Sequence, residues 1–172
     1  MADDRLLVSS RPTMSAAASR LMIDTAVQEA EAMSVAVTVV VVDESGTTKE
    51  MLRMDGAPLV SLQTAINKAF AAASIGMPPD DFYAAIESDE AAVAEFATRP
   101  GLALIAGGLP MIADGRVAGA VGVAGAMTGA EDRRIAEAAL KKVTGPLGRS
   151  ERTTGKLPPA HEESHAYQPH DR

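Results

Sequence analysis

One run of extended-chain residues, Val35 to Val42 (VAVTVVVV), constrains the fold of this 172-residue chain most strongly. β-branched side chains favour strands, and an apolar run without polar alternation is typical of a strand covered on both faces. The turn-forming residues Asp43 to Gly46 follow it, so we expect Thr47 to Met54 to return antiparallel. The sequence therefore predicts a sheet whose central strand is buried between other elements.

Helical periodicity predicts the elements that cover this sheet. A first helix begins near Thr13 or Ser15, either of which can cap it, and a second runs from Pro58 to the proline pair at 78–79. Two short helical stretches, 82–86 and 91–96, follow before Pro100-Gly101. The apolar faces of the two longer helices contain Leu21, Met22, Val27, Ala30 and Met33 in the first, and Leu59, Leu62, Ile66, Ala69, Phe70 and Ala73 in the second.

The sequence pattern from residue 102 to residue 146 predicts three strands and a helix. Residues 102–105 are strand-like, and residues 109–113 and 116–123 flank Asp114-Gly115, a two-residue hairpin turn. Thr128 and Glu131 have the spacing of a capping box, which opens a final helix that Gly145-Pro146 ends. The fold class predicted is α/β (α+β), with helices packed on a mainly antiparallel sheet.

Composition divides the chain in two and excludes several functions. Residues 1–148 form one domain, whereas 149–172 are a polar tail that is either disordered or laid on a partner subunit. The net charge of −7 argues against binding nucleic acid, and no apolar run approaches the length of a membrane span. The first residues lack the pattern of an export signal, so we expect a cytoplasmic protein.

The positions of histidine and the absence of cysteine limit the chemistry further. With no Cys and every His in the tail, the domain has neither a thiolate site nor a Ser-His-Asp set. His161 and His165 have a metal-binding spacing only if they lie on a helix, and the prolines before them favour an irregular tail. We therefore expect no metal site.

Arg53, Asp55 and Lys68 are the candidate catalytic residues. Arg53 and Asp55 share one side of a strand end, and Lys68 adjoins the buried face of the following helix. Desolvation would lower the pKa of a lysine there and suit it to act as a base or amine nucleophile. The competing interpretation is a structural ion pair among the three residues that anchors helix to strand.

The glycines of the hairpin region have two interpretations. Gly107 and Gly108, with Gly119, Gly122 and Gly125, could let a ligand approach the backbone. They equally suit close packing against alanine-rich helices or a neighbouring subunit. Their order does not match a dinucleotide-binding motif.

Three segments together resemble the GlcG/HbpS family, which includes the C-terminal domain of PduO-type proteins. They are Val41-Val42-Asp43 with Arg53-Met54-Asp55-Gly56-Ala57; Ala65 with Lys68-Ala69; and Gly107 to Pro110 with Asp114-Gly115, Gly119 to Gly125, Asp132 and Ala136. The resemblance covers about residues 14–145 and implies a profilin-like sheet of about five strands, assembly into homo-oligomers, and haem as ligand. Ala71 and Ala124 stand where relatives often carry Thr and Ser.

The haem expectation can be set against the residues present. With no His in the domain, an axial ligand would be a Met or Tyr, and the candidates are Met51, Met54, Met77, Met111, Met127 and Tyr83. We assign Gly107, Gly108, Met54 and Met111 as the candidate cofactor-binding residues. Most methionines are core fillers, which is the alternative for each.

Three functions remain open at this level. The first is an oligomeric accessory protein that binds a small molecule, with haem or another tetrapyrrole implied by the resemblance. The second is a cofactor-free isomerase, hydrolase or lyase of a catabolic operon that uses Lys68, Arg53 and Asp55. The third is a structural subunit that docks its tail onto a larger complex.

Overall fold

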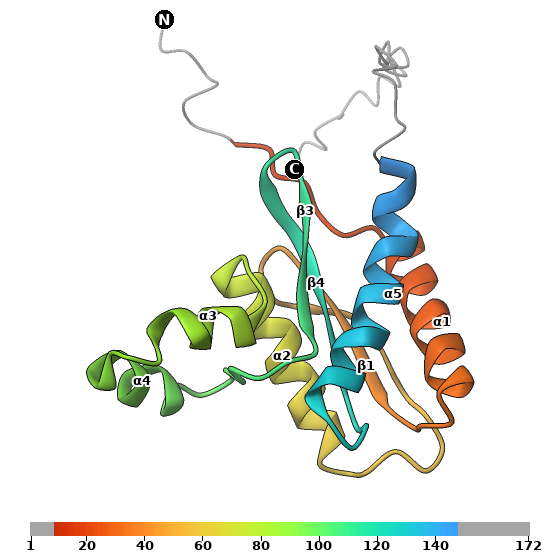
Figure 1. Ribbon diagram of the computed structural model, residues 1–172. Helices are drawn as coiled ribbons and strands as arrows, with labels where there is room; N and C mark the ends of the chain where they lie inside the picture. Colours follow the sequence, from red (N-terminus) through yellow and green to blue (C-terminus); the bar gives the residue numbers. More distant parts are fainter. Residues whose placement is uncertain (1–8, 148–172) are drawn as a thin grey trace, which may run out of the picture.

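The computed structural model describes residues 9–147, which form a mixed α+β fold around one antiparallel sheet (Figure 1). Within that range the sheet has four strands in the order β2-β1-β4-β3. The strands are β1 (Thr38–Asp43), β2 (Thr48–Arg53), β3 (Gly108–Ala113) and β4 (Arg116–Ala124). Residues 38–42 of the valine run are confirmed as a central strand, because β1 lies between β2 and β4 and its valines are fully buried, whereas residues 35–37 precede the strand.

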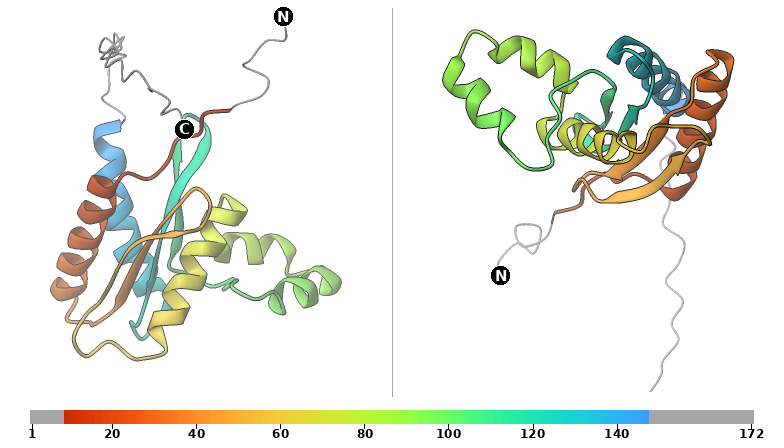
Figure 2. Two further views of the ribbon diagram at one scale, coloured as in Figure 1. Left: turned by 180° about the vertical axis from the view of Figure 1, so that it is seen from behind. Right: turned by 90° about the horizontal axis from the view of Figure 1, so that it is seen from below.

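Helices cover both faces of the sheet (Figure 2). Helix α2 (Ser61–Ile75) packs on one face, against Val40, Val42 and Ala120. Helices α1 (Ala16–Ala32) and α5 (Gly129–Leu147) pack side by side on the other. Successive side chains of β1 enter different cores because side chains alternate across a strand.

Local signals in the sequence match the ends of these elements. The Ser15 hydroxyl caps α1 by accepting a hydrogen bond from the Ala18 N–H at 3.1 Å. Thr128 and Glu131 form the predicted capping box at α5, with reciprocal bonds of 2.9 and 3.3 Å. Asp114 and Gly115 both have positive φ, as a two-residue hairpin requires. Helix α5 runs through Gly145 and Pro146 to Leu147, so the prediction that these two residues end the helix is wrong.

The expectation of about five strands is wrong for the described residues, because residues 102–105 form no strand. Gly101 and Gly107 at either side have φ of 81° and 111°, so the chain turns at both ends of this short run. Three of its four residues are half-buried without joining the sheet, while Ile105 is exposed. Apolar composition alone therefore does not distinguish this loop from a strand.

Glycines in the sheet allow α2 to approach it closely. A Cβ on Gly108 would lie 2.5 Å from the Lys68 carbonyl oxygen, and one on Gly122 would overlap the backbone of Ala65 and Ala69. These contacts leave no room for side chains at either glycine. For Gly108 and Gly122, the packing interpretation is the one that the structure supports.

Two short helices form an arm that projects from the body of the domain (Figure 1). They are α3 (Pro79–Ile86) and α4 (Glu90–Ala97), and α4 has no buried residue. Phe82 and Phe96 meet edge-to-face with ring centroids 5.0 Å apart. No helix within residues 9–147 combines the length and the apolar character needed to cross a membrane.

Candidate functional site

Lys68 and Asp132 form a buried ion pair. The Lys68 ammonium Nζ lies 2.7 Å from Asp132 Oδ2, and the two side chains are 2% and 6% exposed. Nζ also donates to the Val123 carbonyl oxygen at 2.9 Å. The pair thus connects the middle of α2, the end of β4 and the first turn of α5.

The backbone around this pair is adapted to it. The Ala126 N–H donates to Asp132 Oδ1 at 3.1 Å, so both carboxylate oxygens are hydrogen-bonded. A Cβ on Gly107 would lie 3.0 Å from Lys68 Nζ and 2.6 Å from the Val123 carbonyl oxygen. Gly107 therefore provides space for the ammonium group.

Burial raises the pKa of the Asp132 carboxyl above its ordinary 3.8. The hydrogen bond and charge of Lys68 and the Ala126 N–H act in the opposite direction, and the charge of Glu131 adds to the rise. The desolvation effect is the largest of these. The carboxyl of Asp132 is consequently easier to protonate than a surface aspartate.

A pocket of about 450 Å³ lies against this pair, and we call it the Lys68 pocket. Its lining comes from the start of α2, the chain before β3 and the turn between β4 and α5, and includes Val60, Thr64, Lys68, Ile105, Met127 and Asp132. Val60, Ile105 and Met127 are 73%, 52% and 92% exposed, and we call these three the apolar rim. The volume lies within the range of small-molecule sites.

The hydroxyl groups in this pocket already donate to the protein. Thr64 donates to the Val60 carbonyl oxygen at 3.0 Å and Thr128 to Glu131 at 2.9 Å. Ser61 is bonded to the Pro58 carbonyl oxygen and to the Thr38 hydroxyl. These oxygens can accept a further hydrogen bond from a ligand, but their protons are engaged.

The prediction that Lys68 lies together with Arg53 and Asp55 is wrong. Arg53 donates to the Ala57 carbonyl oxygen, and with Asp55 it lines a different pocket, beside Val27 and Glu31 of α1. Lys68 pairs with Asp132 instead. The reason is that Lys68 lies on the face of α2 that packs on β4, whereas the end of β2 lies at the α1 side of the sheet. The structure does not bring the three predicted catalytic residues together.

The four predicted cofactor-binding residues also separate. Gly107 and Gly108 adjoin Lys68, as described above. Met111 is 6% exposed in the core under α1 and α5, and Met54 packs at the edge of that core. Of the methionines considered as haem ligands, Met127 lies on the rim of the Lys68 pocket.

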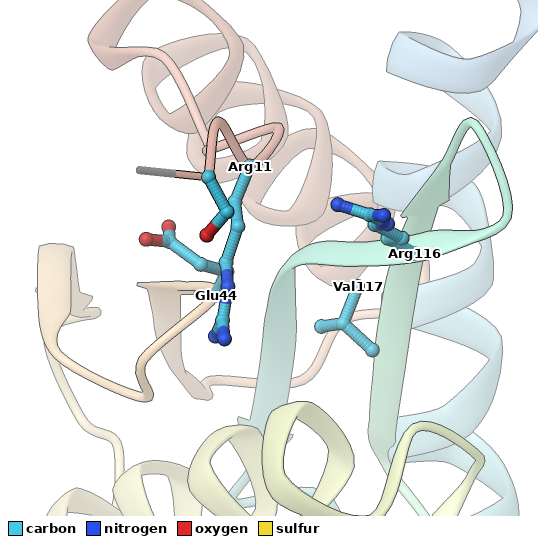
Figure 3. Close-up of a pocket in the computed structure, with 5 residues that line it drawn as sticks. Arg11, Glu44, Arg116 and Val117 are labelled. Atoms are coloured by element: carbon cyan, nitrogen blue, oxygen red, sulfur yellow. The ribbon is translucent and has the colours of Figure 1, made fainter. Parts of the chain in front are cut away.

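A second pocket, of about 520 Å³, is lined by charged residues from three separate segments (Figure 3). Arg11 precedes α1, Glu44 lies in the β1–β2 turn, and Arg116 begins β4. Glu44 Oε2 is buried and has no hydrogen-bond partner among the described residues. Among the described residues that line this pocket, Val117 is the one apolar side chain. Among residues 9–147 no cluster of His, Cys, Asp and Glu could hold a metal ion.

Asp132 and the apolar rim belong to the site but could not be assigned to it from the sequence. Asp132 lies in the first turn of α5, where a carboxylate stabilises the start of a helix, and that local role is the one its position in the sequence suggests. Its second role depends on Lys68, which is 64 residues away. The motif itself contained a signal, since Thr128-Gly-Ala-Glu131 already supplies one capping carboxylate and leaves Asp132 free for another partner.

The fold and the pocket define a small α+β protein with helices on both faces of an antiparallel sheet and a buried amine–carboxylate pair beneath an apolar-rimmed pocket. Residues 14–141 match the family model described as haem degrading protein HbpS-like. The chain belongs to the HbpS-like family, which confirms the resemblance inferred from the sequence.

Individual relatives agree with this assignment. A Citrobacter freundii protein, described as an uncharacterized 15.0 kDa protein in the dhaT-dhaS intergenic region, is 36% identical over 115 residues, which are 65% of this chain and 80% of that protein. The structure of a Streptomyces reticuli HbpS double mutant has a TM-score of 0.72 at 32% identity, covering 78% of this chain and 89% of that one. A PduOC–haem complex has a TM-score of 0.70 at 25% identity, covering 76% and 94%.

Proposed function

We propose that this protein binds a small molecule in the Lys68 pocket, with haem or another tetrapyrrole as the ligand. The observation that carries the proposal is the apolar rim: three large apolar side chains, each more than half exposed, surround the mouth of one pocket. Exposed apolar side chains gathered around a cavity are typical of a ligand-binding surface. A haem complex among the structural relatives supports the choice of ligand.

The residues present fit a tetrapyrrole in two respects. The rim offers apolar contact to a flat macrocycle, and Met127 brings a thioether, a known axial ligand of haem iron, to the pocket mouth. Residues 9–147 contain neither His nor Cys, so Met127 is the soft donor nearest to this site. A bound haem would supply a redox-active iron centre, and this chain would hold it by the apolar rim, with the Met127 thioether as the protein donor.

A hemin titration tests the proposal. We expect a saturable shift of the Soret band, with a stoichiometry near one per subunit or per dimer. Met127→Leu, which removes the thioether and keeps the bulk, should change the band position or weaken binding at least about tenfold. Met77→Leu is the matched control, because Met77 is also exposed but lies outside the pocket, and it should bind as the wild type does.

Truncation after Gly148 completes the test. The shortened chain should give the wild-type haem spectrum. A spectrum lost on truncation would place the ligand at His161, His165 or His170, which lie outside the described residues. The absence of any saturable Soret change would refute tetrapyrrole binding.

We also propose that the protein is a cytoplasmic homo-oligomer with a profilin-like fold. The glycine- and alanine-rich strand β4 does not supply the contact surface expected from the sequence, because its residues 118–124 are buried beneath the chain's own helices. Strand β2 lies at an edge of the sheet and is largely exposed, with Met51 at 46% and Leu52 at 37%, so its open edge is the surface that we propose for pairing with another subunit. Sedimentation at the monomer mass of 17.8 kDa at micromolar concentration would refute assembly.

A further inference from the structure

The Lys68 ammonium has one N–H that no described residue accepts. A protonated lysine has three N–H donors, and two are engaged by Asp132 and the Val123 carbonyl oxygen. Lys68 is 2% exposed, and both it and Asp132 contribute to the lining of the Lys68 pocket. A buried donor with an unfilled valence beside a cavity is a point at which a ligand atom can bind.

The charges around this donor favour a neutral ligand group over an anion. Asp132 compensates the charge of Lys68, and Glu131 in the same turn of α5 adds a second carboxylate. Among residues 9–147 no other Lys or Arg lines the pocket, and the neighbours of the pair in and before the sheet, Val123 and Gly107, are uncharged. An incoming carboxylate would therefore meet a net negative surrounding, whereas a carbonyl oxygen needs only the free N–H.

We propose that Lys68 binds a small apolar aldehyde or ketone covalently, as a Schiff base, and that Asp132 transfers the protons of this reaction. This activity goes beyond tetrapyrrole binding and does not depend on it. The apolar rim selects a carbonyl compound with an aliphatic body, because a charged substituent would lose its hydration there.

The proton and bond changes balance within the pair. The Lys68 ammonium gives one proton to the Asp132 carboxylate, and the free amine attacks the carbonyl carbon, so a C–N bond forms as the C=O π electrons move to oxygen. A second amine proton passes to that oxygen and gives a neutral carbinolamine. The Asp132 carboxyl then protonates the hydroxyl group, water leaves with the C–O electrons, and the nitrogen lone pair completes the C=N bond.

The product keeps the charge pairing of the reactant and gives up the bond from Lys68 to the Val123 carbonyl oxygen. Overall, an ammonium and a carbonyl compound become a protonated imine and water, so one positive charge remains beside the Asp132 carboxylate. The imine keeps one N–H, which can stay bonded to Asp132 Oδ2. No buried carboxylate is left unpaired, which would be strongly unfavourable. The raised pKa of the Asp132 carboxyl supports its part, because a carboxyl that is easier to protonate accepts the lysine proton more readily.

Reductive trapping on the full wild-type chain tests this inference. The protein is incubated with pentanal and cyanoborohydride near pH 7, and modified lysines are located by peptide mapping in a mass spectrometer. Lys49, Lys141 and Lys142 are exposed and serve as internal references. We expect Lys68 to be alkylated at least about tenfold faster than these three. Modification of Lys68 at a rate equal to or below that of the surface lysines would overturn the inference. A result in which only the surface lysines carry the adduct would overturn it as well.

A pair of tryptophan variants tests whether the ligand enters through the pocket. Thr64 lines the pocket one turn before Lys68, and the adjacent Gln63 is exposed outside it. Thr64→Trp should fill the entrance and reduce alkylation of Lys68 at least about tenfold, with the surface lysines unaffected. Gln63→Trp should react as the wild type does. Similar reactivity of Lys68 in both variants would show that the pocket is not the route.

Asp132→Asn tests the proton transfer. This variant should lower the rate of Lys68 alkylation about a hundredfold, in the range of general acid–base catalysis. Circular dichroism checks that the Asp132→Asn variant folds. If it does not fold, the comparison of Thr64→Trp with Gln63→Trp still tests the inference. A folded Asp132→Asn variant that is alkylated at the wild-type rate would exclude Asp132 from the reaction. Loss of hemin binding by Met127→Leu with normal trapping at Lys68 would show that the two activities of this pocket are independent of each other.

Discussion

The 2.7 Å ion pair between Lys68 Nζ and Asp132 Oδ2 joins helices from opposite faces of the sheet. Lys68 extends from α2 past the end of β4, where it also binds the Val123 carbonyl oxygen. Because both partners are almost fully buried, the pair is a structural link between the two layers and the floor of the Lys68 pocket at once. Its removal should therefore affect stability and ligand chemistry separately.

Removal of one partner should be more damaging than removal of both. Lys68→Met leaves the Asp132 carboxylate buried without its counter-ion, and we expect the free energy of unfolding to fall by about 3–5 kcal/mol. The double variant Lys68→Met with Asp132→Leu should recover most of that loss, because no charge is then left unpaired. Urea unfolding of the four proteins of this cycle measures both effects. Additive losses in the double variant would contradict the interpretation of the two residues as a coupled pair.

The pH dependence of stability should reveal Asp132. Its folded-state pKa is raised above the 3.8 of the unfolded chain, so the folded protein holds this proton more tightly. The corresponding stabilisation is complete below about pH 3.8 and is lost as the pH rises through the folded-state pKa. The free energy of unfolding of the wild type minus that of Asp132→Asn should therefore decrease as the pH rises across this window. A difference that increases with pH would mean that the pairing with Lys68 outweighs desolvation.

Gly107 should tolerate no side chain. Its φ is 111°, and a Cβ there would lie 2.6 Å from the Val123 carbonyl oxygen and 3.0 Å from Lys68 Nζ. Gly107→Ala should lower the free energy of unfolding by more than about 1 kcal/mol and slow the trapping of Lys68. Gly145→Ala is the control, because a Cβ there meets open space in α5 and should be neutral or stabilising by up to about 1 kcal/mol. Thermal unfolding compares the two, and equal melting temperatures would contradict the prediction.

Arg133 should hold the α3–α4 arm against the body. It donates to Asp80 at 2.6 Å, to Asp81 at 2.9 Å and to Glu137 at 3.1 Å, and these carboxylates raise its pKa. Since Arg133 is 30% exposed, we expect Arg133→Ala to cost only about 1 kcal/mol, and less at high salt. Amide exchange should accelerate in residues 79–97 and stay unchanged in β1. Arg134→Ala, which removes a bond to Glu29 of α1, should leave the arm unaffected.

Several elements were predictable because short-range patterns specify them. The β-branched run predicted β1, Asp114-Gly115 predicted the hairpin, and the Thr128–Glu131 spacing predicted the start of α5. Each of these signals depends on neighbours within a few residues. Residues 102–105 show the limit of that approach, since their apolar side chains are compatible with a strand but the positive φ at Gly101 and Gly107 turns the chain away from the sheet.

The sequence by itself determined the family, the identity of the central strand and the unusual position of Lys68 on a buried helix face. Only the tertiary structure decided which group neutralises it, and the answer was Asp132 rather than Asp55. A buried ammonium must have a partner, but periodicity places it only on a face of its own helix and not against a particular residue of another. That choice depended on how α2 and α5 cross the end of β4, which brings together atoms 64 residues apart in the chain.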